Sequence, residues 1–178
     1  LSGAGTWVGS TQEAEEMCEE LQEQFWLTMF QISRSGPKVM LTAETVSMRM
    51  KQRIRMQKLL MARNILLQED SLARRIYSQQ LARGWPGLAR EVSKICKEIG
   101  IDDINEKMSD KEVLKEAVFY HNYREMKEDM MKYRRLEEIR HHDFRCLPDY
   151  IAKEKSLEKV RLAYRVRTKM VSDIKQNF

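Results

Sequence analysis

The sequence predicts an all-α protein of about six to seven helices. The chain has 178 residues, of which 42% are hydrophobic and 33% charged, and only 7 Gly and 3 Pro interrupt it. Apolar residues recur at the three-to-four spacing of amphipathic helices, and the only short alternating run covers residues 6–8. This composition excludes collagen-like, low-complexity and disordered chains.

The first predicted helix covers residues 11–31 and follows a capping box, Ser10-x-x-Glu13. Residues 1–36 hold six acids against one base, a net charge of −5, and the acids crowd the first turns, where they complement the helix dipole. Its apolar residues, which we expect to face the core, are Met17, Leu21, Phe25, Met29 and Ile32. Gly36-Pro37 ends this segment.

The second predicted helix covers residues 45–68 and carries no acid. Residues 37–68 hold seven bases and one acid, a net charge of +6. Two apolar stripes lie on nearly opposite sides, so we expect the helix to pack between two partners with its cations emerging at both seams. The two basic bands are Lys51, Arg55 and Lys58 on one side, and Arg49, Arg53 and Arg63 on the other.

The remaining helices are predicted from their caps. Asp70 or Ser71 begins a third helix that ends at Gly84, and a fourth runs from Leu88 to Gly100. A second capping box, at residues 109–112, opens a long helix whose apolar pattern continues to residue 139. Pro148 precedes a last helix within residues 149–178, which hold eight bases and four acids, net +4.

Catalytic and metal-binding patterns are missing from the sequence. There is no G-x-S-x-G, P-loop or H-E-x-x-H motif, and the one Asp pair, Asp102-Asp103, lies in a polar turn. His141, His142 and Cys146 offer too few ligands for structural zinc. We therefore predict no enzyme activity, no catalytic residue, no metal and no cofactor.

Targeting signals are also missing. No run approaches the roughly 18 apolar residues of a membrane helix, and residues 1–10 do not resemble a secretory signal. The three cysteines show no C-x-x-C spacing, which favours a reducing compartment. We predict an intracellular protein, cytoplasmic or nuclear, with no membrane partner. Because the chain starts at Leu1 and stops within a helical pattern, we expect it to be part of something longer.

The acid-free helix at 45–68 is the strongest functional signal, because neighbouring cations are costly to hold together without a polyanion. We expect it to contact RNA or DNA backbone. The alternative is that the glutamates of the first helix neutralise it, leaving a helical scaffold whose Met-rich and aromatic faces dock a protein partner. The candidate nucleic-acid-binding residues are Arg49, Lys51, Arg53, Arg55 and Lys58, with Lys159, Arg161 and Arg165 as a second patch.

The order and spacing of five short segments resemble those of a known protein family. These segments are residues 5–9 (GTWVG), 36–45 (GPKVMLTAET), 48–54 (MRMKQRI), 69–73 (EDSLA) and 84–88 (GWPGL). In this order they resemble the region downstream of the palm in reverse transcriptases of animal non-LTR (LINE-type) retrotransposons. The resemblance implies an RNA-directed DNA polymerase whose fingers and palm lie upstream, with residues 1–68 as a thumb-like helical segment and 69–178 as a helical linker. It supplies no catalytic residue here, because the metal-binding aspartates of the family have no counterpart.

Overall fold

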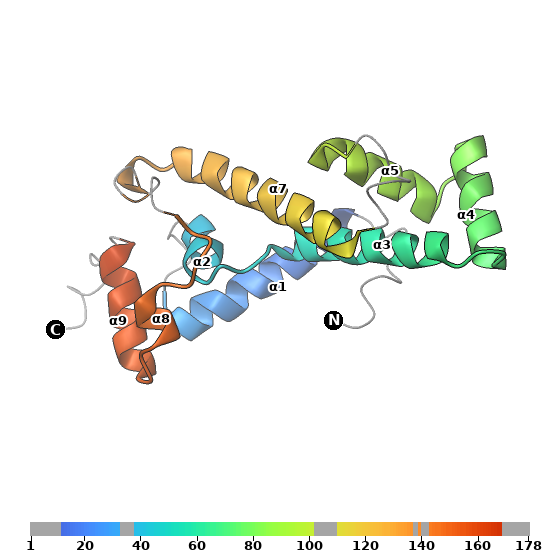
Figure 1. Cartoon of the computed structure of the whole chain (residues 1–178). Helices are drawn as coiled ribbons and strands as arrows, with labels where there is room; N and C mark the ends of the chain where they lie inside the picture. The colour runs from blue at the N-terminus through green and yellow to red at the C-terminus, as the bar shows by residue number, and fades with distance from the viewer. Residues whose placement is uncertain (1–11, 33–37, 102–109, 137–138, 140–142, 169–178) are drawn as a thin grey trace. The chain divides into compact units, whose positions relative to one another are not determined.

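The computed structural model describes residues 12–32, 38–101, 110–136, 139 and 143–168. It confirms the all-α class: this part of the chain contains eight α-helices, one 3-10 helix and no strand (Figure 1). The helices are α1 (Gln12–Phe30), α2 (Val39–Glu44), α3 (Met50–Leu67), α4 (Leu72–Arg83), α5 (Leu88–Ile99), α7 (Lys111–Met131), the 3-10 helix η2 (Arg134–Leu136), α8 (Asp149–Ala152) and α9 (Leu157–Arg167). No helix in these ranges combines the length and apolar character that a bilayer crossing requires.

The chain forms two compact units, each made from two separate stretches of sequence. Unit 1 comprises Leu1–Cys18 and Met50–Asn122, and unit 2 comprises Glu19–Arg49 and Tyr123–Phe178. The packing units therefore do not follow the boundary between residues 68 and 69. The division into a thumb-like segment and a linker segment stays a functional prediction.

Helix α3 lies at the centre of unit 1, where it contacts α4 and α5. Ile54 belongs to one of its two predicted apolar stripes and Leu59 to the other, and both side chains are fully buried. Val92 and Cys96 of α5 are buried as well. An α-helix that is apolar on two sides has to be covered twice. The prediction that α3 is packed on both sides is thus confirmed at its centre.

The caps of α4 and α5 follow the sequence closely. Ser71 precedes α4, and its side-chain oxygen accepts a hydrogen bond from the backbone N–H of Arg74 at 3.0 Å. Gly84 ends α4 and Gly100 ends α5, both with left-handed backbones at φ 64° and 78°. Gly87 turns the chain between them at φ 148°, where an added Cβ would lie 2.6 Å from the Gln80 side chain. Glycine is favoured at these positions because it lacks a Cβ.

The cysteines in the described part of the chain differ sharply in accessibility. Cys96 is buried in unit 1, and burial raises the pKa of its thiol to about 11, whereas Cys146 is exposed. Because the thiolate is the reactive species, we expect Cys146 to be labelled by a chromogenic disulfide reagent within the native state. Cys96 should react only as fast as unit 1 opens. Mass spectrometry of timed, quenched samples measures both rates, and early labelling of Cys96 would contradict its burial.

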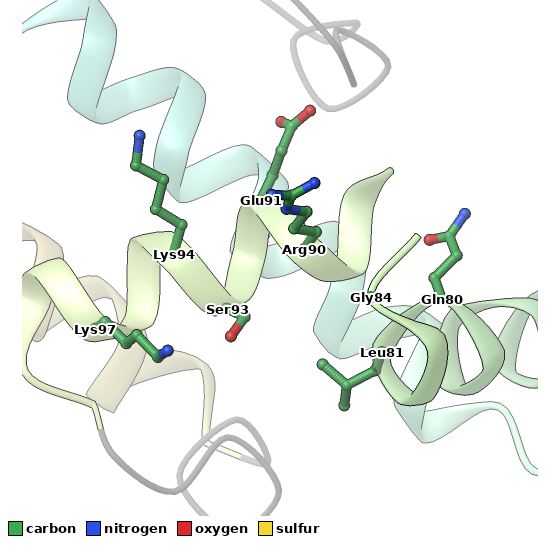
Figure 2. A pocket seen from close by; sticks show the side chains of 8 residues that line it. All are labelled: Gln80, Leu81, Gly84, Arg90, Glu91, Ser93, Lys94 and Lys97. Carbon is green, nitrogen blue, oxygen red and sulfur yellow. The ribbon is translucent and has the colours of Figure 1, made fainter. Parts of the chain in front are cut away.

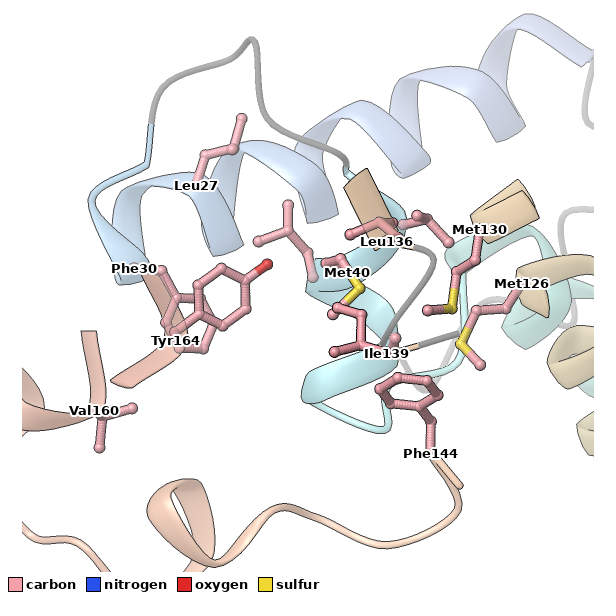
Figure 3. Close-up of a cluster of buried hydrophobic side chains, with 13 residues drawn as sticks. Leu27, Phe30, Met40, Met126, Met130, Leu136, Ile139, Phe144, Val160 and Tyr164 are labelled. Carbon is pink, nitrogen blue, oxygen red and sulfur yellow. The ribbon is translucent and has the colours of Figure 1, made fainter. Parts of the chain in front are cut away.

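Unit 2 is built around a cluster of apolar side chains from α1, α2, α7, α9 and η2 (Figure 3). The rings of Phe30 and Tyr164 stack with their centroids 4.4 Å apart. Met40, Met130 and Leu136 are fully buried beside them. The cluster joins residues from both ends of the sequence, so unit 2 depends on contacts between distant segments.

The predicted core-facing side of α1 is wrong. Leu27 and Phe30 are the buried side chains of this helix, and Trp26 packs partly against the cluster. Four of the five residues that the spacing assigned to the core, Met17, Leu21, Phe25 and Met29, are exposed by 38% to 65%, whereas the fifth, Ile32, packs partly against the cluster. Helix α1 has two apolar faces. The face that carries Trp26 and Phe30 is covered by the rest of unit 2.

Two helix boundaries also differ from the prediction. Helix α3 begins at Met50, because the chain turns after α2 and Val46 adopts a positive φ of 49°. The long helix α7 ends at Met131, and η2 follows it, so the apolar spacing up to residue 139 does not belong to one helix. Asp110 caps α7, accepting from the N–H of Glu112 at 2.8 Å. The predicted caps Ser10 and Ser109 lie outside the described residues.

Candidate functional site

Two of the three residues of the first basic band, Arg55 and Lys58, point into unit 1. Arg55 forms an ion pair with Glu98 of α5 at 2.6 Å, and its side chain is 11% exposed. Lys58 is 4% exposed and lies 2.8 Å from Glu91 of α5 and 3.6 Å from Glu15 of α1. The expectation that these two cations emerge to solvent is wrong. They neutralise acids of neighbouring helices, and only one of these acids belongs to the first helix.

The second band begins with Arg49, which binds Asp129 of α7 at 2.5 Å within unit 2. Lys132 binds the other oxygen of the same carboxylate, also at 2.5 Å. Partial burial acts to raise the pKa of Asp129, but hydrogen bonds from Lys132 and Arg49 outweigh it and leave that pKa below its ordinary value. Arg53 is exposed and Lys51 is half-buried. The predicted α3 residues therefore do not share one open surface.

The second predicted patch, on α9, supports the end of α1. Arg161 donates through Nε to the carbonyl of Met29 at 2.8 Å, and Arg165 donates through Nη2 to the carbonyl of Gln31 at 2.9 Å. Cations at a helix C-terminus satisfy carbonyls that lack a partner within the helix. Lys159 is exposed and lies 3.8 Å from Glu154. Two of the three residues thus have a structural role in unit 2.

A third group of cations, which the sequence analysis did not select, lies on α5. Arg90, Lys94 and Lys97 are exposed and follow the i, i+4, i+7 spacing of one helix face. Together with Ser93 they line a surface hollow of about 560 Å³ between α5 and the end of α4 (Figure 2). No carboxylate among the described residues forms an ion pair with these three cations. We call Arg90, Lys94 and Lys97 the α5 cation row.

The surroundings of the α5 cation row are also positive. Residues 71–90 contain four arginines and no acid. The one acid lining the hollow, Glu91, is the partner of buried Lys58. Arg83 stacks over the ring of exposed Trp85, with its guanidinium carbon 4.8 Å from the ring centroid. The acid-free stretch at 71–90 is the sequence signal for this surface, and it is shorter than the acid-free stretch at 45–68.

No cluster of three metal-ligating side chains occurs within the described ranges. His141 and His142 lie outside those ranges, so the structure does not describe the group of His141, His142 and Cys146, which the sequence analysis considers too small for zinc. Asp102 and Asp103 lie outside them as well. The absence of a catalytic site, a metal and a cofactor stays a prediction from the sequence. Comparison of the chain with family models, curated proteins and solved structures found no match.

Proposed function

We propose that this chain is a noncatalytic helical module that contacts the phosphate backbone of RNA or DNA. The observation that carries the proposal is the α5 cation row, three exposed cations on one helix face beside a hollow. The resemblance to the post-palm region of a non-LTR reverse transcriptase supports the same function. In that setting the module would act together with the fingers and palm upstream.

The α5 cation row is a better candidate than the α3 residues for an energetic reason. A phosphate that binds Lys58 or Arg55 has to reach a cation whose side chain is only 4% or 11% exposed, and it has to displace Glu91 or Glu98 from that cation. Arg90, Lys94 and Lys97 are already hydrated, so a phosphate releases counterions and breaks no ion pair in the described structure. We therefore transfer the proposed contact from α3 to α5.

The α5 cation row predicts a specific salt dependence. For three phosphate contacts, log affinity should fall against log salt with a slope of about −2 to −3. The triple variant Arg90→Gln, Lys94→Gln and Lys97→Gln should lose most of that slope, because glutamine keeps the helix but removes the charge. Fluorescence anisotropy with a labelled oligothymidine of about 20 nucleotides, and with an RNA duplex of similar length, measures the slope between about 50 and 200 mM salt.

A matched control removes the same charge elsewhere. Lys111, Arg134 and Lys155 are exposed and lie outside the α5 row, so their triple Gln variant should keep the wild-type slope. A slope that drops equally in both triples would show a response to net charge alone and contradict the proposed site. Wild-type protein without any salt-dependent binding at about 100 μM would contradict nucleic-acid contact altogether.

The second candidate function is a helical scaffold that docks a protein partner. The internal ion pairs of Arg55 and Lys58 favour it, because they explain the basic helix without a polyanion. The exposed apolar side of α1 favours it as well. Both functions are compatible in one chain, since the α5 row and the α1 side chains do not overlap.

A further inference from the structure

Helix α1 carries a continuous apolar stripe that nothing in the described structure covers. Met17, Leu21, Phe25 and Met29 follow one another at i, i+4 spacing and are exposed by 65%, 63%, 58% and 38%. At the rise of an α-helix they extend over about 18 Å. Single exposed apolar residues are common on proteins, but four in a row on one helix face indicate an interaction surface. We call these four residues the α1 stripe.

The charge beside the α1 stripe is of one sign. Helix α1 holds six glutamates and no basic residue. Glu15 and Glu23 are partly covered and pair with Lys58 and Lys38. Glu13 and Glu20 are exposed and flank the stripe along one edge, so the surface is apolar in the middle and acidic at that edge.

A small hollow adjoins the acidic edge. It has a volume of about 250 Å³ and is lined by Glu20, Glu23, Gln24, Leu27 and Lys38. Lys38 is already bound to Glu23, whereas the Glu20 carboxylate has no cation among the described residues. A long basic side chain that crosses the edge of the stripe would place its aliphatic stem beside Leu27 and its charge beside Glu20.

We propose that the α1 stripe docks an amphipathic helix of another protein, with apolar residues toward the stripe and Lys or Arg along the edge that meets Glu13 and Glu20. Helix-in-groove recognition of this type reads apolar anchors at i, i+3 or i+4 and i+7. Charge complementarity along the flank sets the orientation of the partner and disfavours acidic competitors.

A second copy of α1 is the less suitable occupant. Two α1 helices side by side would bring together twelve glutamates, six from each copy, without one basic residue of their own. In the antiparallel arrangement the acidic edges would meet directly, and like charges at such positions are destabilising. Nucleic acid is unsuitable for the same reason, because its phosphates are repelled by the glutamates. This inference is therefore independent of the nucleic-acid proposal.

The experiment uses the whole chain and a synthetic probe. The probe is a fluorescein-labelled peptide of about 18 residues, with Leu at three-to-four spacing and Lys on both flanks, which suits a helix of this length. A second peptide has Glu in place of every Lys. We expect the Lys peptide to bind and the Glu peptide to bind at least about tenfold more weakly.

Substitutions in the α1 stripe test whether the probe binds there. Leu21→Gln with Phe25→Gln should raise the Kd of the Lys peptide by about tenfold or more, because large apolar anchors dominate such interfaces. The matched control is Leu72→Gln with Ile76→Gln, an i, i+4 pair on α4 with exposed fractions of 66% and 48%. It should change Kd by less than about twofold.

A separate variant tests the acidic edge of the α1 stripe. Glu13→Gln with Glu20→Gln should weaken binding about threefold at low salt, and the difference should disappear at high salt, where exposed charges are screened. Circular dichroism checks that each variant keeps the helical signal of the wild type, as expected for exposed sites.

Three results would overturn the inference. If the Lys and Glu peptides bind equally well, the partner is not selected by basic residues. If the α1 and α4 substitution pairs weaken peptide binding equally, the α1 stripe is not the binding site. Sedimentation that shows a wild-type dimer, converted to monomer by Leu21→Gln with Phe25→Gln, would assign the stripe to a second copy of the chain. Loss of the α5 cation row should leave peptide binding unchanged, which separates this test from that of nucleic-acid contact.

Discussion

Replacing Glu44 with Ala should cost about 3 kcal/mol of the free energy of unfolding. This is the lower end of the usual effect of breaking a buried ion pair on one side, because the side chain of its partner Arg167 is 32% exposed. Glu44 is fully buried at the end of α2. Its Oε1 accepts from Nε of Arg167 at 2.7 Å, and its Oε2 accepts from the hydroxyl of Tyr150 at 2.5 Å. The variant therefore removes the partner of a cation and the acceptor of a partly buried hydroxyl.

The protonation state of Tyr150 supports this hydrogen bond. Burial raises the pKa of the Tyr150 hydroxyl, and the hydrogen bond to the Glu44 carboxylate and the charge of that carboxylate raise it further. The phenol thus remains a donor across the pH range in which the protein is folded. Glu44→Gln keeps the size of the side chain but removes its charge, so it separates loss of the ion pair from loss of volume.

Urea unfolding followed by circular dichroism measures the cost of Glu44→Ala. The matched control is Glu158→Ala on the exposed side of α9, which should change the free energy of unfolding by less than about 0.5 kcal/mol. A loss below about 1 kcal/mol for Glu44→Ala would mean that the carboxylate is hydrated in solution and that the buried cluster is not formed.

Replacing Lys58 with Ala should cost about 3 kcal/mol, since it removes a buried cation from two carboxylates. The ammonium of Lys58 lies 2.8 Å from Glu91 and 3.6 Å from Glu15, and the lysine side chain is 4% exposed. Both glutamates remain partly open to water, which places the expected loss at the lower end of the range for buried pairs.

Lys58→Met distinguishes packing from charge at the same position. Methionine retains most of the aliphatic volume, so the difference between the Ala and Met variants measures the cavity, and the remaining loss in Met measures the unpaired acids. Lys94→Ala on α5 is the exposed control and should be nearly neutral. Wild-type stability in Lys58→Ala would contradict the ion pairs and restore Lys58 as a candidate for ligand contact.

Local signals predict the part of the fold in which neighbours in sequence are neighbours in space. Ser71, Gly84 and Gly100 identify the ends of α4 and α5 because capping depends on a few adjacent backbone groups. The side of α1 that is covered depends instead on Tyr164, far away in the sequence. The apolar spacing of α1 is satisfied by either side, so the sequence pattern alone selects the wrong one.

The same distinction explains the candidate site. An acid-free helix indicates positive charge, but whether that charge is exposed depends on Glu91, Glu98 and Asp129, which belong to later helices. Spacing within α3 contains no information on these partners. Composition therefore predicts positive charge on α3, but it does not predict which of its cations are exposed.

The long separation between partners in unit 2 has a consequence for the order of events during translation. Glu44 and Arg167 are 123 residues apart, so at the usual elongation rates their codons are read roughly 6–25 s apart. Helix α2 has six residues, too few to persist by itself in water. The nascent chain must therefore expose the acidic α1 and the side chains around Met40 until α9 emerges from the ribosome. We therefore expect unit 2 to be completed only after α9 has been synthesised, with its apolar side chains exposed until then.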